Sequence, residues 1–394
     1  MLYQTENRHG GDIYGGIALD FSANVSPLGT PRSVTDAIER ALPELYRYPD
    51  PYCRTLVQTI SEYEGVPKNF VLCGNGASEL IYAYCGAVRP KRTMELAPTF
   101  SEYSLALRRT GCEVVRFALK QEENFDLREN FLPILAREKI DALFLCNPNN
   151  PTGAVYPKET LLKLVDIARE FGLIIFADEV YDKILYEDAK HIAIASLSTD
   201  VLTITFNSLS KAYRACGYRA GWMIISGNKL PARDFIEGLN MLANMKLCAN
   251  VPGQWAIQTA LGGYQSINDL VCEGGRLRVQ RDLAWELLTQ IPGVTCVKPQ
   301  GSLYMFPRLD PKIYPIENDR QFFKELLEAT RVLLVQGTGF NWPHPDHFRV
   351  VFLPHEPQLR EAISRIAEYL AAWRAAHPVK EEPATPRKKE GAAE

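Results

Sequence analysis

Lys211 is the residue whose surroundings in the sequence most favour covalent chemistry. It ends the run SLSK at residues 208–211, directly after the apolar strand candidate 201–206, and Arg219 follows eight residues later. An amine that is desolvated at a strand end and close to another cation has a lowered pKa, as attack on a carbonyl requires. The serines and the arginine also offer the donors and the positive charge that bind a phosphate ester. The alternative is a solvated surface lysine, the usual state of a lysine taken alone.

Asp178 closes a second strand candidate, residues 172–177, and Tyr181 follows three residues later. A carboxylate at a strand end can keep the nitrogen of a pyridine ring protonated, so that the ring withdraws electrons from a bound substrate. Tyr181 could donate a hydrogen bond to an oxygen on such a ring. The competing interpretation of Asp178 is the N-cap of a helix.

Two loops after strand candidates add polar groups. Residues 147–153 (NPNNPTG) follow the strand candidate 141–146, and residues 74–78 (GNGAS) link a strand to a helix. The backbone N–H groups of the second loop and the N-terminus of its helix form an anion site. This loop is not a dinucleotide-binding fingerprint, because Glu79 stands where the third glycine belongs. Three motifs follow one another along the chain, each after its own strand: an Asn-Pro turn, Asp-x-x-Tyr and Ser-x-Ser-Lys. Their combination in this order is a more specific signal than any one of them alone.

Phe100 and Arg349 are further candidates, each with a competing interpretation. Phe100, in the run PTFSEY, could stack on a cofactor ring, although a lone phenylalanine usually packs in a core. Arg349 lies on a strand candidate that reads as buried, residues 348–352, and a buried arginine needs an anionic partner. A substrate carboxylate and a structural ion pair would both satisfy it.

The elements that carry these residues alternate between strands and helices, which predicts an α/β fold with a mostly parallel sheet. The strand candidates are residues 71–73, 141–146, 172–177 and 201–206, and the helix candidates are residues 77–88 and 158–171. Because open α/β sheets bind ligands at the carboxyl ends of their strands, the motifs are expected to meet at one edge of the sheet.

From about residue 291 the pattern changes to short strands around few helices, which predicts a smaller α+β domain. Its strand candidates are 294–297, 303–306, 332–335 and 348–352, and its helix candidates are 319–328 and 358–374. We expect an N-terminal arm with part of the smaller domain over 1–45, a large domain over 46–285, the small domain over 286–374 and a disordered tail over 375–394.

Composition excludes several classes of partner. The net charge of −3 over 394 residues gives no electrostatic case for nucleic acid or an anionic membrane surface. No apolar run approaches the roughly 20 residues that span a bilayer, and no secretory signal is recognised. The nine cysteines are scattered and unpaired by spacing, which predicts reduced core residues and a cytoplasmic protein. His344 and His347 lack further ligands nearby, so no metal site is expected.

With these motifs in order, the chain resembles the class I/II aminotransferases of pyridoxal-phosphate (PLP) fold type I over about residues 15–372. The resemblance implies an aspartate aminotransferase-like α/β fold, a PLP-dependent transaminase, and pyridoxal 5′-phosphate as the cofactor. The cofactor-binding residues implied are Tyr48, Gly76, Ala77, Ser78, Phe100, Asn150, Asp178, Tyr181, Ser208, Ser210, Lys211 and Arg219.

The same resemblance implies a role for individual residues. Lys211 is the Schiff-base lysine, and Asp178 and Tyr181 complete the catalytic set at the pyridine nitrogen and the ring oxygen. Arg349 clasps the substrate α-carboxylate; Asn24 and Asn150 also contact the substrate, and Asn150 reaches the ring oxygen as well. Tyr48, in the run RYPD, reaches the cofactor phosphate of the neighbouring subunit, which implies a homodimer with shared active sites.

The two parts of the chain resemble different branches of this family. Residues from about 145 to 370, with LIIFADEVYDKILY and LTITFNSLSK, resemble bacterial glutamate–pyruvate (alanine) aminotransferase. The first 145 residues or so, with LDFSANVSPLG and APTFSEYSLALRRTGCEVVRF, resemble threonine-phosphate decarboxylase and histidinol-phosphate aminotransferase. Both a natural mosaic and a constructed hybrid fit this pattern.

The substrate hypotheses follow from these two branches. In the phosphate-substrate branch two arginines of the small domain act together; one maps to Arg349, whereas residues 335–337 contain no arginine for the other. The decarboxylase branch also tends to have Phe where this chain has Tyr181. We therefore expect an aminotransferase that uses a small L-amino acid, alanine in particular, with 2-oxoglutarate or pyruvate as oxoacid. The alternatives are a threonine-phosphate decarboxylase or histidinol-phosphate-type aminotransferase, and a PLP-binding scaffold without turnover.

Overall fold

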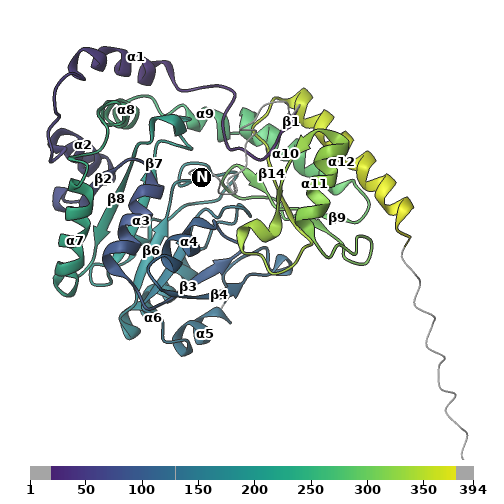
Figure 1. Ribbon diagram of the computed structural model, residues 1–394, viewed down its shortest axis with the longest axis horizontal. Helices are drawn as coiled ribbons and strands as arrows, with labels where there is room; N and C mark the ends of the chain where they lie inside the picture. Colours follow the sequence, from purple (N-terminus) through teal and green to yellow (C-terminus); the bar gives the residue numbers. More distant parts are fainter. Residues whose placement is uncertain (1–18, 129, 379–394) are drawn as a thin grey trace, which may run out of the picture.

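A seven-stranded sheet forms the centre of the molecule (Figure 1). The computed structural model describes residues 19–128 and 130–378. The strands run in the order β2 (Val71–Gly74), β8 (Gly221–Ser226), β7 (Thr203–Ser208), β6 (Ile174–Asp178), β5 (Ala142–Cys146), β3 (Arg92–Ala97) and β4 (Glu113–Ala118). β8 is antiparallel to both of its neighbours, and the other pairs are parallel. The predicted α/β class with a mostly parallel sheet is confirmed.

Helices cover both faces of this sheet because alternate side chains of its central strands are apolar on both sides. In β5, Phe144 packs in the core under one layer of helices, whereas Leu143 packs in the core under the other. The first layer holds α3 (Ala77–Val88), α4 (Glu102–Arg108) and α7 (Arg233–Asn244), and the second holds α5 (Phe131–Arg137) and α6 (Lys158–Phe171). At the β2 edge, α8 (Val251–Gly262) contacts α1 (Arg32–Ala41) and α2 (Arg54–Glu64).

A second group of short strands and helices packs beside the sheet, on the right of Figure 1. Its sheet has the order β10 (Tyr304–Met305), β14 (Phe348–Val351), β13 (Val335–Gln336), and two strand pairs join β1 (Leu19–Asp20) to β12 (Val332–Leu333) and β9 (Val294–Thr295) to β11 (Arg308–Leu309). Its helices are α9 (Ile267–Val271), α10 (Arg276–Thr289), α11 (Asp319–Thr330) and α12 (Glu356–Ala376). The N-terminal strand β1 was not among the predicted strands. It pairs in parallel with β12 and brings the chain from residue 20 onward toward β14.

The ends of the chain limit what the structure says of the predicted segments. Helix α12 continues to Ala376, two residues into the segment predicted as a tail, and residues 379–394 lie outside the described part. Residues 1–18 of the predicted N-terminal arm also lie outside it. Over residues 19–128 and 130–378, no helix has the length and apolar character needed to cross a bilayer.

The register of the sheet brings the predicted motifs to one edge. Cys146, Asp178 and Phe206 lie side by side on β5, β6 and β7, so the loops that follow these parallel strands leave the sheet together. Ser208 and Gly74 both pair with Gly221 on the antiparallel strand β8. The glycine loop after β2 therefore opens at the same edge as the loop that carries Lys211.

Candidate active site

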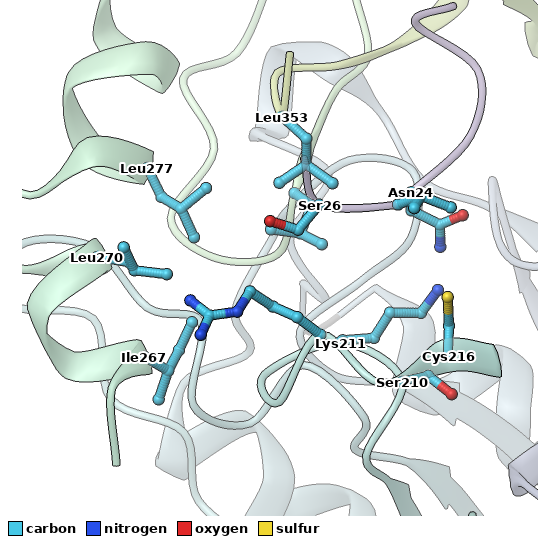
Figure 2. Close-up of a pocket in the computed structure, with 12 residues that line it drawn as sticks. Asn24, Ser26, Ser210, Lys211, Cys216, Ile267, Leu270, Leu277 and Leu353 are labelled. Atoms are coloured by element: carbon cyan, nitrogen blue, oxygen red, sulfur yellow. The ribbon is translucent and has the colours of Figure 1, made fainter. Parts of the chain in front are cut away.

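Lys211 lies in the loop after β7, where Leu209 N donates a hydrogen bond to Ala220 O and fixes the loop against the start of β8. Its side chain is half-buried and lines a pocket together with Asn24, Cys216 and Leu270. Figure 2 shows the amine turned toward Asn24 and Cys216, away from the apolar side chain of Leu270 on the opposite wall. A solvated surface lysine, the competing interpretation, does not fit this position.

The surroundings of this amine change its acidity. Burial lowers the pKa of Lys211 to about 8, and the Arg349 guanidinium acts in the same direction. Arg219 adds a smaller effect of the same sign, while Cys216 and Asp178 favour the charged form. The amine is therefore partly neutral near neutral pH, as a nucleophile and a base must be.

Asp178 ends β6 with its side chain buried beside Lys211. Its Oδ2 accepts a hydrogen bond of 2.6 Å from the Tyr103 hydroxyl, and its Oδ1 accepts one of 3.3 Å from Val180 N. Burial raises the pKa of the carboxyl, whereas the Tyr103 and Val180 hydrogen bonds and the charge of Lys211 act against that rise. No helix begins in the turn that follows, so Asp178 does not serve as a helix N-cap.

Tyr103 is a site residue that the sequence analysis missed. It projects from α4 and is fully buried, with its ring against Phe144 of β5 and Phe176 of β6. The ring of Phe100, half-buried, meets that of Tyr103 edge-on at 5.6 Å between centroids. Phe100 is thus placed close to Asp178 through Tyr103.

The glycine loop after β2 and the turn before β8 form one anion-binding corner. Gly76 has a φ of +86°, and a Cβ there would lie 2.7 Å from the Arg219 Nη2 atom, so glycine allows the guanidinium to approach the backbone. The N-terminus of α3, with Ala77 and Ser78 in its first turn, points its positive end at this corner. Ser210 N donates to Ser208 Oγ at 3.3 Å, and Ser210 lines the same pocket as Lys211.

Asn250, at the N-cap of α8, ties this corner together and was not predicted. Its side-chain nitrogen donates to Asn75 Oδ1 at 2.9 Å and to Arg219 O at 3.0 Å. Its Oδ1 accepts from Gly253 N at 2.7 Å, which caps the helix. One amide thereby holds the glycine loop, the arginine turn and α8 at fixed separations.

Arg349 is almost fully buried on β14, with 4% of its surface exposed. Nη1 donates to Asn150 Oδ1 at 3.1 Å and Nη2 donates to Ser22 O at 2.5 Å, while Nε has no partner among residues 19–128 and 130–378. Within the described residues no carboxylate lies within ion-pair distance of this guanidinium, which disfavours the structural ion pair. A buried cation held by two neutral oxygens is a suitable receptor for an anion.

Tyr304 of β10 links three of the predicted residues and was also missed. Its hydroxyl lies 2.6 Å from the Tyr181 hydroxyl and accepts a hydrogen bond of 2.7 Å from Asn24 Nδ2. The centre of the Arg349 guanidinium lies 4.5 Å from the centroid of its ring. The Lys211 amine lies 6.0 Å from the ring centroid of Tyr181, so these residues form one cluster around the amine.

Tyr48 is the one predicted residue that stands apart from this cluster. It lies between α1 and α2 with 89% of its surface exposed. The cluster and the anion-binding corner bring together the others of the predicted set.

Comparison with known proteins identifies the family. The family model described as aminotransferase class I and II matches residues 17–366. The chain belongs to this family. It is 50% identical over 312 residues to the glutamate-pyruvate aminotransferase AlaA of Haemophilus influenzae, a match that covers 79% of this chain and 77% of the relative. It is 46% identical over 363 residues to the alanine aminotransferase of Mycobacterium tuberculosis, covering 89% of this chain and 85% of that one.

A solved structure supports the predicted fold type. The crystal structure of an aminotransferase from Escherichia coli superposes with a TM-score of 0.86 at 42% identity and covers 91% of each chain. A threonine-phosphate decarboxylase of Salmonella typhimurium is 31% identical over 293 residues, covering 74% of this chain and 77% of that protein. Both expected branches are thus found, and neither likeness is confined to one part of the chain.

This class I and II aminotransferase is a PLP-dependent enzyme of fold type I, and its described residues fit that cofactor. A partly neutral lysine lies close enough to a buried carboxylate, Asp178, and to Arg219 of the anion-binding corner for both charges to act on its amine. The glycine at 76, which leaves space beside Arg219, suits the close approach of a phosphate to the backbone.

Proposed function

We propose that this aminotransferase transfers the amino group of L-alanine to 2-oxoglutarate, with pyruvate and L-glutamate as products. The observation that carries the proposal is the buried guanidinium of Arg349, which has a free Nε and lies close enough to Lys211 to lower the pKa of its amine. One cation at this place suits the α-carboxylate of an amino acid. The names of the relatives, which include alanine aminotransferase and glutamate-pyruvate aminotransferase, support a small amino acid as the donor.

The proposed roles in the reaction follow from the positions of the side chains. PLP, when bound, supplies a ring that withdraws electrons from the substrate α-carbon. Asp178 would be the partner of the ring nitrogen, and the Tyr103 hydrogen bond favours the ionised form of its carboxyl. Arg349 and Asn150 bind the α-carboxylate and thereby turn the α-carbon toward Lys211. Lys211 Nζ would take the proton from the α-carbon of the amino acid. In the second half-reaction the same groups would act in reverse order, and Lys211 Nζ would return a proton to the α-carbon of the oxoacid.

The proposed phosphate contacts come from the corner between β2, β8 and α3. The N–H groups of Ala77 and Ser78 and the side chains of Ser208, Ser210 and Arg219 provide donors and positive charge there. Asn250 keeps the two sides of this corner at a fixed distance. We propose Phe100 as the residue that stacks on the ring, on the ground of its position beside Tyr103.

A phosphorylated substrate is the second candidate, favoured by the likeness to threonine-phosphate decarboxylase. The segment where a second arginine would stand contains Val335, Gln336 and Gly337. A Cβ at Gly337 would lie 2.7 Å from the carbonyl oxygen of His347, so this backbone leaves no room for a side chain. A substrate phosphate would lack a bidentate partner here, which favours an unphosphorylated amino acid.

A half-reaction tests the proposed function. Addition of L-alanine alone to the PLP-loaded enzyme should change the cofactor absorbance and release pyruvate, and 2-oxoglutarate should then reverse the change. Lys211→Ala should abolish both steps while the protein still holds PLP. Lys229→Ala is the matched control, because this lysine also has a pKa lowered by burial but lies against Phe70, outside the site.

Each competing function predicts a different result in this assay. Release of CO₂ from threonine phosphate without an oxoacid would promote the decarboxylase. A lack of turnover over a broad panel of amino donors, with PLP bound, would favour a scaffold without catalysis.

The assembly, the location and the domain division are also proposals. We propose a homodimer with shared active sites, supported by the exposed position of Tyr48 outside the site of its own chain. We propose a cytoplasmic protein, supported by nine cysteines that are all free. The proposed division at residues 45/46, 285/286 and 374/375 is supported in outline by the sheet over 71–226, which shares no strand with the sheets formed by β1 and residues 294–351. In detail, 285/286 falls inside α10 and 374/375 inside α12.

A further inference from the structure

Tyr304 occupies the junction of three parts of the active site without belonging to the residues that would touch the cofactor. It lies on β10 opposite Val351 of β14, and its side chain is fully buried. Its hydroxyl contacts the hydroxyl of Tyr181, which follows β6, and the amide of Asn24, which follows β1. Its ring lies against Arg349.

The partners within reach of these three polar groups favour one direction for the hydrogen bonds between them. Burial raises the pKa of the Tyr304 and Tyr181 hydroxyls, so each keeps one proton to donate. Asn24 Nδ2 donates to the Tyr304 oxygen, so among the described residues the Tyr181 oxygen, 2.6 Å away, is the one acceptor within reach of the Tyr304 proton. With its oxygen accepting from Tyr304, the Tyr181 hydroxyl has its own proton free to donate to another group.

The ring of Tyr304 has a second contact that is independent of its hydroxyl. The centre of the Arg349 guanidinium lies 4.5 Å from the Tyr304 centroid and 4.7 Å from the Phe340 centroid, so it contacts two aromatic rings. Such contacts restrict a guanidinium to one plane and stabilise its charge. Two of its nitrogens are bonded to Asn150 and Ser22, so these hydrogen bonds and the two rings together fix the orientation of the Arg349 guanidinium. Among the described residues only its Nε is left to bind another group.

We propose that Tyr304 is a positioning residue with two separate actions: its hydroxyl directs the Tyr181 proton into the active site, and its ring orients Arg349. Asn24 donates to Tyr304, and Tyr304 in turn donates to Tyr181. The segment after β1, which carries Asn24, therefore affects how strongly the Tyr181 hydroxyl donates its proton. The inference rests on the proposed role of Tyr181 as the donor to the ring oxygen of PLP.

A pH titration of the cofactor absorbance in the substrate-free, PLP-loaded enzyme tests the hydroxyl. A donor at the ring oxygen favours the deprotonated form of the bound cofactor, which has more negative charge on that oxygen. Tyr181→Phe should therefore raise the midpoint of the titration, and Tyr304→Phe should raise it by part of that amount, up to about one pH unit. Tyr304→Phe should have no effect in the Tyr181→Phe background, because the hydroxyl through which it acts is gone.

Two further variants make this titration decisive. Asn24→Ala removes the first donor without touching the core packing of Tyr304 and should shift the midpoint in the same direction. Tyr186→Phe is the matched control, because Tyr186 is buried, lies 4.4 Å from the Arg281 guanidinium and donates its hydroxyl to Ser302 O, all outside the site. The cofactor absorbance of Tyr186→Phe should have the same titration midpoint as that of the parent enzyme.

The ring is tested by substrate affinity. Tyr304→Phe keeps the ring and should bind L-alanine within about twofold of the parent, whereas Tyr304→Leu should weaken it by about tenfold. The inference is overturned if Tyr304→Phe and Asn24→Ala have the titration midpoint of the parent while that of Tyr181→Phe is raised. It is also overturned if Tyr304→Leu binds L-alanine as tightly as Tyr304→Phe does. An unshifted Tyr181→Phe would instead contradict the role of Tyr181. The titration needs no substrate, so its result is independent of the choice of alanine.

Discussion

Lys211 is surrounded by groups that act on its amine in opposite directions. Burial and Arg349 favour the neutral amine, whereas Asp178 favours the charged one, and the net result is a pKa of about 8 in place of 10.5. About a tenth of the amine is then neutral at pH 7, compared with a few ten-thousandths for an ordinary lysine. Arg349 therefore has two effects. Its guanidinium is proposed to bind the substrate α-carboxylate, and its charge also increases the neutral fraction of the Lys211 amine.

This shift predicts how the cofactor-free enzyme captures PLP at different pH values. Since only the neutral amine attacks the aldehyde, the capture rate should increase with pH and level off above about 8. Absorbance after rapid mixing measures it, and a free lysine derivative is the reference, because its capture rate should keep increasing to about pH 10.5. Arg349→Met should move the midpoint upward, because a charge that favours the neutral amine is removed. A midpoint near 10.5 in the parent enzyme would mean that Lys211 behaves as a solvated amine.

At the scale of elements, the sequence predicts strands and helices well where the pattern is local. The helices 77–88 and 158–171 begin and end where predicted, because each has an apolar face of helical period and a clear start, and α6 ends at Gly172 with a φ of +69°. The motif loops follow their strands for a similar reason: turn residues come directly after apolar runs. The meeting of these loops at one edge follows from parallel pairing.

The residues that the sequence did not reveal act through partners far along the chain. Tyr103 and Asp178 are 75 positions apart, Tyr181 and Tyr304 are 123 apart, and the Asn75–Asn250 pair is 175 apart. Nothing local in the sequence specifies such a contact. Tyr103 lies three residues after Phe100, in the same run PTFSEY, but only the position of α4 against β5 and β6 turns its hydroxyl toward Asp178.

Gly221, the first residue of β8, is the point at which three of these elements touch. It pairs with Gly74 on β2 and with Ser208 on β7. A Cβ at this position would lie 2.8 Å from Ala77 N, 2.9 Å from Gly76 C and 3.0 Å from Asn207 O. All three are backbone atoms, which cannot move aside as the end of a flexible side chain can.

Gly221→Ala is therefore expected to weaken PLP binding at the anion corner and to lower the free energy of unfolding by about 1–3 kcal/mol. The N-terminus of α3 must move away from β8 to admit the methyl group, which changes the distance between its N–H groups and Arg219. Fluorescence titration with PLP and denaturant unfolding measure the two effects. Gly217→Ala is the matched control, because a Cβ there has no neighbour within 4 Å. Equal PLP affinity of the two variants would contradict this account of Gly221.

At the scale of the whole molecule, apolar side chains are exposed along one end, over the turn between α1 and α2 and over α7. Both α2 and α7 contact β2 at the edge of the large sheet, on the left of Figure 1. The exposed apolar residues of this end are Leu42, Leu45, Tyr46, Tyr48, Tyr52, Met241, Leu242 and Met245. An apolar patch of this kind is typical of a subunit interface. A homodimer that covers it would bury Tyr48 and could bring its hydroxyl to the cofactor phosphate of the other subunit.

Mixed dimers test whether Tyr48 acts in the site of its own chain or in that of its partner. Lys211→Ala alone should be inactive, and Tyr48→Ala alone should have weakened PLP binding and low activity. In a dimer of one Lys211→Ala and one Tyr48→Ala subunit, shared sites would leave one site with both residues native and one with neither. After unfolding and refolding of an equal mixture, about half of the dimers are hybrids, so about a quarter of the parent activity should appear. If Tyr48 serves its own chain, every site lacks one of the two residues, and the mixture should be no more active than the average of the two variants.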